Sequence, residues 1–271
     1  MAGSGGGCGV STVWRDGRLI ESELGISPVE AGWGAFTTVG CDGGHPLLWT
    51  RHRSRLAASL RFLGADNDVA LPDEPVLCEL LRAGGHDGAA RLRVVGRRKQ
   101  NSGWTIEASA SVSEAAGLDA PPARLLLQRW QAAPPLAGHK TLARLPWDLA
   151  RERARREGAD DVLLVDEAGH VLETAIANVW LRRGRELWTP PAPVRCLPGI
   201  MRGWLLEHMG ALGLQALECD LTEADLLGAD ELWISNAVGG VRRVASVAGR
   251  EWRSWPSYED LAELGVPAPG W

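Results

Sequence analysis

The chain has 271 residues, of which 45% are hydrophobic and 23% are charged, with a formal net charge of −5. This is the composition of a globular protein large enough to bury a core in one or two domains. The mild acidity argues against a nucleic-acid-binding protein, because such domains usually carry a basic excess. No apolar stretch of about 18 residues occurs, and the Gly-rich start does not resemble a signal peptide. We therefore expect a cytoplasmic protein without a membrane or nucleic-acid partner.

Two residue types narrow the chemistry further. The aromatic residues comprise 13 Trp, two Phe and a single Tyr, Tyr258, which excludes a mechanism that needs several tyrosines. The cysteines lie far apart, form no C-x-x-C pair and are five in number: Cys8, Cys41, Cys78, Cys196 and Cys219. This spacing is not that of a disulfide framework or a zinc ribbon, so no metal site is expected.

The first part of the chain predicts an α+β lobe. Residues 1–10 are expected to form a flexible lead-in. In chain order the hydrophobic periodicity and turn residues then predict a hairpin over 11–20, strands over 35–39 and 46–49, helices over 50–65 and 74–82, and strands over 90–95 and 104–110. Pro121 and Pro122 indicate a linker over 118–122, so the N-terminal lobe is expected to span 11–117.

The second part, residues 123–271, is expected to form a larger C-terminal lobe. Its pattern predicts strands over 123–130, 161–166, from 170 and over 178–181, a helix over 145–157, a helix over 200–212 and a strand over 231–235. The arginines of the first of these helices alternate with glutamates, which is typical of a solvated face.

Two charged side chains of this lobe lie in unusual surroundings. Lys140, one of only two lysines in the chain, lies among small and apolar residues at a predicted helix start. Desolvation there would lower its pKa, which Schiff-base chemistry requires, although an ordinary surface lysine is the alternative. Glu173 lies in an otherwise apolar predicted strand, where a carboxylate needs a partner such as a protonated pyridine nitrogen. A solvent-facing glutamate at a strand edge is the alternative.

Two segments could bind an anion. Residues 197–202 lead directly into a predicted helix, whose first amides have no acceptor within the helix. Residues 235–240 follow a predicted strand and could add hydroxyl, amide and backbone donors. Each segment is equally compatible with an ordinary helix start or turn.

In their order and spacing these features resemble the fold-type IV pyridoxal-phosphate enzymes, the class-IV aminotransferase family. The matching stretches lie within residues 12–247 and are 34–38, 51–56, 136–145, 159–166, 169–179, 188–190, 199–202 and 229–237. The resemblance implies a two-lobed α+β or α/β fold with a small N-terminal lobe and a larger cofactor-binding lobe. It also implies pyridoxal 5'-phosphate as the cofactor, a small-molecule substrate, and a homodimer in which each subunit shapes its neighbour's pocket.

The resemblance assigns roles to particular residues. Lys140 would form the Schiff base and act as acid and base, while Glu173 would keep the pyridine nitrogen protonated. Arg55 would bind the phosphate as a charged donor. The remaining cofactor contacts would come from Asn178, Gly199, Ile200, Met201, Asn236 and Ala237.

Within the family the chain is most similar to the lyases that convert 4-amino-4-deoxychorismate to 4-aminobenzoate and pyruvate, a step of folate biosynthesis. Arg144, four residues after the lysine, and the pair Thr37 and Thr38, where transaminases commonly carry a glutamate, favour elimination. The alternative is a transaminase of D-amino or branched-chain amino acids. A catalytically silent binding protein is less favoured, because such a protein needs neither Lys140 nor Glu173.

The substrate contacts are the least determined part of the site. Arg97, Arg98 and Lys99 are candidates for binding substrate carboxylates, and an exposed basic loop is the alternative. Trp33 is a further candidate, because it lies close to motifs that shape the pocket, and Arg144 is another, because its place four residues after the lysine resembles the lyase subgroup. The chain departs from the family over 28–33, which replaces the usual Asp-Arg, and at Ala143, which replaces an Asn.

Overall fold

A computed structural model describes residues 10–15, 18–23, 32–67, 69–99, 103–113, 117–131 and 136–269, with the backbone alone for the strands before residue 24. The predicted N-terminal hairpin consists of β1 (Val10–Arg15) and β2 (Arg18–Glu23), which pair antiparallel in a sheet of their own. The lead-in is expected over 1–10, but Val10 already belongs to β1. Residues 1–9, the turn residues 16–17, and the segments 28–31 and 100–102 lie outside the described residues.

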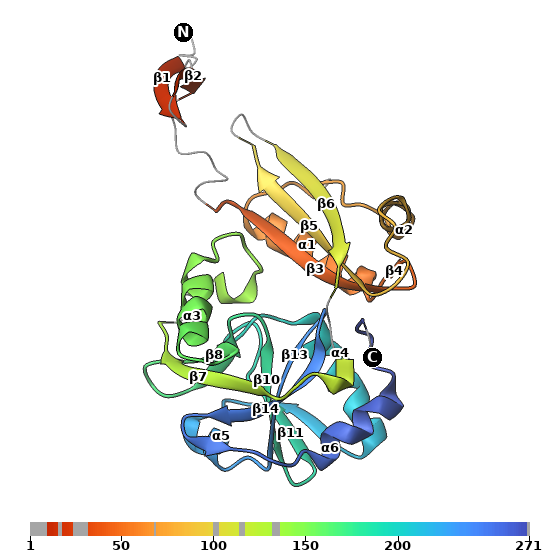
Figure 1. Cartoon of the computed structure of the whole chain (residues 1–271), viewed down its shortest axis with the longest axis vertical. Coiled ribbons are helices and arrows are strands. Elements are labelled where there is room, and N and C mark those ends of the chain that lie inside the picture. The colour runs from red at the N-terminus through yellow and green to blue at the C-terminus, as the bar shows by residue number, and fades with distance from the viewer. Residues whose placement is uncertain are drawn as a thin grey trace.

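The first lobe is an antiparallel sheet in the order β4-β3-β5-β6, with two helices (Figure 1). Its strands are β3 (Gly34–Asp42), β4 (His45–Pro46), β5 (Ala90–Arg98) and β6 (Trp104–Val112), and its helices are α1 (Trp49–Phe62) and α2 (Glu74–Ala83). Leu56 and Leu60 of α1, Leu77 and Leu81 of α2 and Leu92 of β5 are fully buried in one cluster. Both helices therefore pack on the same face of the sheet.

The strand predicted over 46–49 ends at Pro46 in the structure, so the prediction is wrong for residues 47–49. Leu48 has a left-handed backbone conformation, with φ of 54°, and α1 begins at the next residue, Trp49. The apolar side chains in this stretch instead begin the helix, and Trp49 is buried.

The second lobe is built on a nine-stranded mixed sheet in the order β12-β11-β10-β13-β14-β7-β8-β9, with β15 beside β14. Its strands are β7 (Ala123–Arg129), β8 (Asp161–Val165), β9 (Val171–Thr174), β10 (Asn178–Arg183), β11 (Glu186–Thr189), β12 (Gln215–Glu218), β13 (Glu231–Asn236), β14 (Gly240–Val247) and β15 (Arg250–Glu251). Its α-helices are α3 (Leu145–Arg156), α4 (Ile200–His208), α5 (Glu223–Leu227) and α6 (Pro256–Glu259).

Tryptophans fill part of this lobe's core. Trp180 and Trp233 pair across β10 and β13, are fully buried, and share a cluster with Met201 and Leu205 of α4 and with Tyr258. On α3, Ala150 and Ala154 pack against β8. The helix predicted over 200–212 ends at His208 and continues as a 3₁₀ turn, Met209–Leu212.

The chain thus has the two-lobed α+β fold that the resemblance implies, with a four-stranded and a nine-stranded sheet (Figure 1). Because β6 ends at Val112 and β7, which belongs to the second sheet, begins at Ala123, we propose the lobe boundary at 118–122. Among the described residues no helix has the length and apolar character needed to cross a membrane.

Candidate active site

A cavity of about 760 Å³ lies where the two lobes meet. Its floor includes the segment around Lys140, which pairs with the edge of β3: the Phe36 amide donates to the Lys140 carbonyl at 2.9 Å, and the Leu142 amide to the Gly34 carbonyl at 2.8 Å. Lys140 therefore does not begin a helix, contrary to the prediction, since α3 begins at Leu145. Backbone pairing across the lobes fixes its position instead.

The Lys140 amine is partly desolvated in this position. Burial lowers its pKa to about 7, and the guanidinium groups of Arg55 and Arg144 act in the same direction. Its Nζ lies 4.9 Å from the centre of the Phe36 ring. A large fraction of this amine is unprotonated at neutral pH, so it can serve as a nucleophile or base.

Glu173 on β9 faces the same cavity. Burial raises its pKa to about 7, although the Leu197 amide, which donates to Oε2 at 3.1 Å, acts in the opposite direction. Asn178 Nδ2 donates to the Leu197 carbonyl at 2.9 Å. Two side chains from neighbouring segments thus hold the backbone of Leu197 by both of its polar groups. This contact fixes the Glu173 carboxylate beside the start of α4.

Arg55 reaches the cavity from α1. Its Nη1 donates to the Pro198 carbonyl at 3.2 Å and its Nη2 to Thr37 Oγ1 at 3.1 Å. Thr37 is fully buried, and its hydroxyl also lies 2.6 Å from His52 Nδ1. Burial holds the pKa of His52 well below its usual range, so this ring is neutral. Sequence reasoning missed His52, because one histidine on a helix carries no recognisable spacing.

The start of α4 closes the end of the cavity. A side chain at Gly199 is excluded, because a Cβ there would lie 1.9 Å from Asn178 Oδ1. The amides of Ile200 and Met201 lie in the first turn of α4, where helical geometry gives them no acceptor within the helix. Opposite, Asn236 Oδ1 accepts from the amides of Val238 and Gly239 at 3.0 and 2.8 Å and shapes the adjacent turn.

Most of the predicted cofactor and catalytic residues line this cavity, as does the substrate candidate Arg144. They are Thr38, Arg55, Lys140, Arg144, Glu173, Asn178, Gly199, Ile200, Asn236 and Ala237. Thr37 lies behind Arg55, and the Met201 side chain belongs to the core below α4. Residues more than 100 positions apart in the sequence thus meet at one cavity.

The other substrate candidates lie elsewhere. Arg97 forms an ion pair with Glu107, and the Arg98 guanidinium lies 4.1 Å from the centre of the Trp33 ring. Trp33 donates to the Leu63 carbonyl at 3.1 Å. The described residues that line the cavity do not include Trp33, Arg97, Arg98 or Lys99. Their predicted contact with substrate stays a prediction.

Besides Arg55, four arginines face the cavity, and we name them the arginine wall: Arg91, Arg93, Arg144 and Arg151. Sequence reasoning identified only Arg144, although Arg91 and Arg93 alternate with buried Leu92 and Val94 on β5, a pattern that places both arginines on one face. Arg151 is predicted to lie on a solvated helix face, but its side chain lies 3.8 Å from Asp161 and reaches the cavity.

Arg93 is the member of the wall that shares the Phe36 ring with Lys140. Its guanidinium lies 3.9 Å from the centre of the Phe36 ring, on which the Lys140 amine also lies. It forms no ion pair with a carboxylate of the described residues, and burial, reinforced by nearby Arg144, lowers its pKa. An anionic ligand in the cavity would relieve this repulsion.

Comparison with known proteins places the chain in a family. The model of the amino-transferase class IV family matches residues 34–247. The chain belongs to this family. It is 27% identical to an aminodeoxychorismate lyase of Vibrio harveyi over 84% of this chain and 88% of that protein. It is 32% identical to a branched-chain-amino-acid aminotransferase of Escherichia coli, over 37% of this chain and 33% of that enzyme.

Solved structures agree with this assignment. A structure from Legionella pneumophila, described as a putative 4-amino-4-deoxychorismate lyase, superimposes with a TM-score of 0.81 at 25% identity, over 90% of this chain and 94% of that chain. A branched-chain aminotransferase from Thermoproteus uzoniensis gives a TM-score of 0.79 at 23% identity, over 94% and 93%. The second likeness shows the fold alone.

Members of the class IV family use pyridoxal phosphate as their cofactor. The described residues fit this group by their chemistry. The cavity offers an amine with a lowered pKa at Lys140, a partly buried carboxylate at Glu173, and a cationic donor at Arg55. Gly199 lets Asn178 pack against the start of α4, where a larger residue would collide with its side chain.

Proposed function

We propose that this protein is a pyridoxal-phosphate-dependent lyase that converts 4-amino-4-deoxychorismate to 4-aminobenzoate and pyruvate, in the service of folate biosynthesis. The arginine wall beside Lys140 carries this proposal. The substrate has two carboxylates, and four guanidinium groups facing one cavity suit a ligand with more than one negative charge. The similarity to a Vibrio harveyi aminodeoxychorismate lyase over most of both chains supports it.

The cofactor would be held mainly by the second lobe. In this proposal Lys140 binds it covalently and Glu173 faces the ring nitrogen. Asn178 holds the Leu197 carbonyl, and the Leu197 amide in turn donates to Glu173. When bound, the cofactor delocalises negative charge from the substrate carbon that carries the amine. Glu173 would supply the proton that makes the ring a better acceptor of that charge.

An anion cup would bind the phosphate, and we define it by Arg55, Gly199, Ile200, Met201, Asn236 and Ala237. The amides of Ile200 and Met201 lie at a helix N-terminus, where the helix dipole favours an anion. Arg55, fixed by Thr37 and the Pro198 carbonyl, supplies the charge. The burial that lowers its pKa to about 10 leaves it charged at neutral pH.

Lys140 would move the proton of the reaction. Once substrate has displaced it, its amine, with a pKa of about 7, can accept the proton from the amine-bearing ring carbon. Arg93 and Arg144 would hold the substrate carboxylates near this amine, and Thr38 faces the same space. Expulsion of the enolpyruvyl group then yields the aromatic ring.

Transamination is the second candidate, because aminotransferases begin with the same proton transfer. The 32% identity to branched-chain aminotransferases over about a third of each chain favours it. The arginine wall argues against this alternative. Branched-chain substrates carry one carboxylate and an apolar side chain, and an apolar side chain packs poorly against charged groups.

One experiment separates the two activities. The holoenzyme is supplied with 4-amino-4-deoxychorismate in the absence of any keto acid, and pyruvate and 4-aminobenzoate are measured over many turnovers. The lyase proposal predicts equal amounts of both products and continued turnover. Turnover that stops after one equivalent and resumes on addition of 2-oxoglutarate would replace it with the transaminase.

We also propose a homodimer that functions in the cytoplasm. Exposed apolar side chains lie beside the cavity, including Val112, Leu145 and Leu149, which are 68%, 67% and 60% exposed. A second copy packed on this face would cover them. Sedimentation should give a dimer for the wild type and a monomer for the double variant Leu145→Lys, Leu149→Lys; a monomeric wild type would contradict the proposal.

A further inference from the structure

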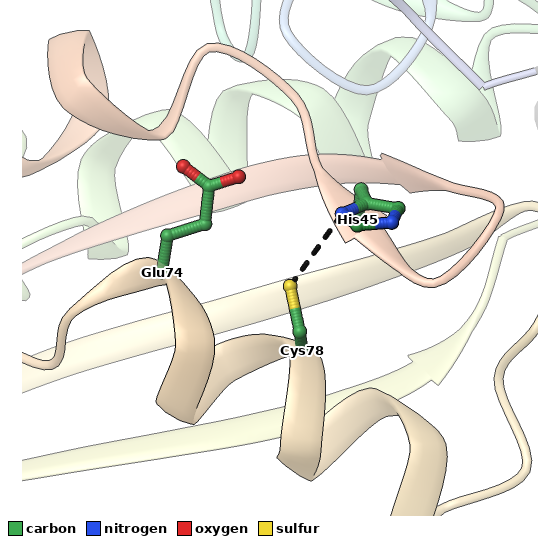
Figure 2. Close-up of side chains that lie close together, drawn as sticks. All are labelled: His45, Glu74 and Cys78. Carbon is green, nitrogen blue, oxygen red and sulfur yellow. Dashed lines mark hydrogen bonds between the residues drawn. The ribbon is translucent and has the colours of Figure 1, made fainter.

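A group of metal-ligating side chains lies on the first lobe, away from the catalytic cavity. His45 at the start of β4, Glu74 at the first residue of α2 and Cys78 one turn later face a common space (Figure 2). Their ligand atoms all lie within 4.8 Å of one another. None of the three is among the described residues that line the cavity. Because 33 positions separate His45 from Cys78, sequence spacing could not indicate this cluster.

The distance between sulfur and nitrogen matches metal geometry. Cys78 Sγ lies 3.6 Å from His45 Nδ1. A tetrahedral Zn²⁺ ion, bound at about 2.3 Å to a thiolate and about 2.0 Å to an imidazole, keeps those two atoms about 3.6 Å apart. A cation can therefore bridge these two ligands without a change in the backbone.

The fold fixes the elements that carry the ligands. Glu74 and Cys78 are four residues apart on α2 and so share one helix face, while Leu77 and Leu81 anchor the helix in the core. His45 pairs with Asp42 across a turn in which Gly43 and Gly44 adopt left-handed φ angles of 55° and 76°. This turn returns β4 along β3 and places the imidazole above α2 (Figure 2).

Neighbouring carboxylates are already engaged, whereas Glu74 is not. Asp73 lies 3.3 Å from Arg53 in an ion pair, and Asp42 Oδ1 accepts from the Gly43 amide at 3.0 Å. Glu74 forms no ion pair with any residue that the structure describes, and its exposed side chain can rotate toward the imidazole and thiol. It is the available third ligand.

We propose that His45, Glu74 and Cys78 form a binding site for a divalent cation of zinc-like chemistry, with water in the fourth position. A thiolate and an imidazole select Zn²⁺ over Mg²⁺ and Ca²⁺, which prefer oxygen ligands alone. The cation replaces the thiol proton, which passes to solvent, and no electron transfer is involved. Bound metal would tie α2 to the β3–β4 turn.

Cobalt titration of the holoenzyme tests the site directly. Tetrahedral Co²⁺ absorbs visible light at longer wavelength than the cofactor, and Zn²⁺ displaces it from a zinc site. The wild type should bind one equivalent of Co²⁺ with this absorption. Cys78→Ser should abolish the absorption. His45→Ala or Glu74→Gln should weaken binding by at least about tenfold, because loss of a residue that merely orients a metal ligand already costs that much. Cys219→Ser, a control at another half-buried thiol, should bind normally.

A labelling experiment needs no variant. Iodoacetamide modification of wild-type Cys78, followed by mass spectrometry, should slow at least about tenfold with Zn²⁺ present and remain unchanged with Mg²⁺. Modification of Cys219 serves as the internal control. Absence of the tetrahedral absorption in the wild type, its retention in Cys78→Ser, or equal labelling of Cys78 with and without Zn²⁺ would overturn the proposal. None of these results depends on which reaction the cavity catalyses.

Discussion

The two lobes contribute side chains to the same cavity, and these side chains are held in different ways. We call the two contributions the first-lobe wall and the second-lobe wall. On the second-lobe wall, Glu173 and Asn178 hold the backbone of Leu197 by its amide and carbonyl, and Gly199 leaves no room for a side chain. On the first-lobe wall, Arg93 rests on Phe36 and has no carboxylate partner among the described residues. The second lobe therefore fixes the positions of groups that transfer protons, while Arg93 of the first lobe presents a charge that a bound anion can neutralise.

Lys140→Ala should have the largest effect, because the second-lobe wall then lacks both its nucleophile and its base. We expect the rate to fall by more than about 10³-fold with the fold unchanged. Pyruvate release and circular dichroism measure the two quantities. A variant that is folded and retains a tenth of the activity would show that the lysine is not the base.

Glu173→Gln keeps the size of the side chain and removes its charge. We expect a loss of about 10²-fold or more in kcat with little change in KM, since the group acts on the reaction and not on substrate binding. Glu173→Asp should recover part of the loss. A change confined to KM would show that Glu173 acts in substrate binding and not in the reaction.

Arg93→Leu tests the first-lobe wall. Loss of one charge-assisted contact, worth about 1.5–3 kcal/mol, should raise KM by about 10- to 150-fold while cofactor affinity stays the same. Arg97→Leu is the matched control, because Arg97 lies on the same strand but pairs with Glu107 outside the cavity. If Arg97→Leu raised KM and Arg93→Leu did not, substrate would bind near Arg97 and not at the arginine wall.

The pKa of Lys140 gives a prediction about pH. The unprotonated amine is the reactive form, and burial lowers the pKa to about 7 in the folded chain. Acylation of Lys140 in cofactor-free protein should therefore rise through about pH 7 and level off above it. An ordinary lysine, with a pKa of about 10.4, continues to gain about tenfold per pH unit beyond that point. Mass spectrometry of the labelled peptide follows the profile, and a rise that continues to about pH 10 would refute the burial argument.

Thr37→Val should have the smallest effect. It removes one hydroxyl that accepts from Arg55 and leaves the cavity lining intact. A net loss of about 0.5–1.5 kcal/mol should weaken cofactor binding by about 2- to 10-fold, and Thr37→Ser should restore it. Unchanged cofactor affinity in Thr37→Val would remove the positioning role of this residue.

The sequence allowed more of the second-lobe wall to be predicted than of the first. Lys140, Glu173 and Gly199 lie in local motifs whose residue types suit one cofactor, and the cavity brings them together. Arg93 was missed, because the sequence does not show which face of a strand lines a cavity. Arg151 was missed for a similar reason. Its side chain lies beside Asp161, whereas the other arginines of α3 are exposed.

Long-range pairing also explains the local errors. Lys140 was expected at a helix start, but backbone hydrogen bonds to β3, about 100 positions earlier in the chain, hold it in an extended segment. The short strands β11, β12 and β15 gave no pattern of their own, because two to four residues carry little periodicity. Their place in the sheet depends on neighbours and not on local propensity.

The fate of the substrate nitrogen tests most directly whether this cavity performs an elimination. In an elimination the nitrogen stays on the ring, whereas in a transamination it passes to a keto acid. The holoenzyme is given 4-amino-4-deoxychorismate labelled with ¹⁵N together with unlabelled 2-oxoglutarate, and the products are analysed by mass spectrometry. We expect the label to stay in 4-aminobenzoate, with one pyruvate formed for each labelled molecule. Label found in glutamate would contradict it and establish transamination.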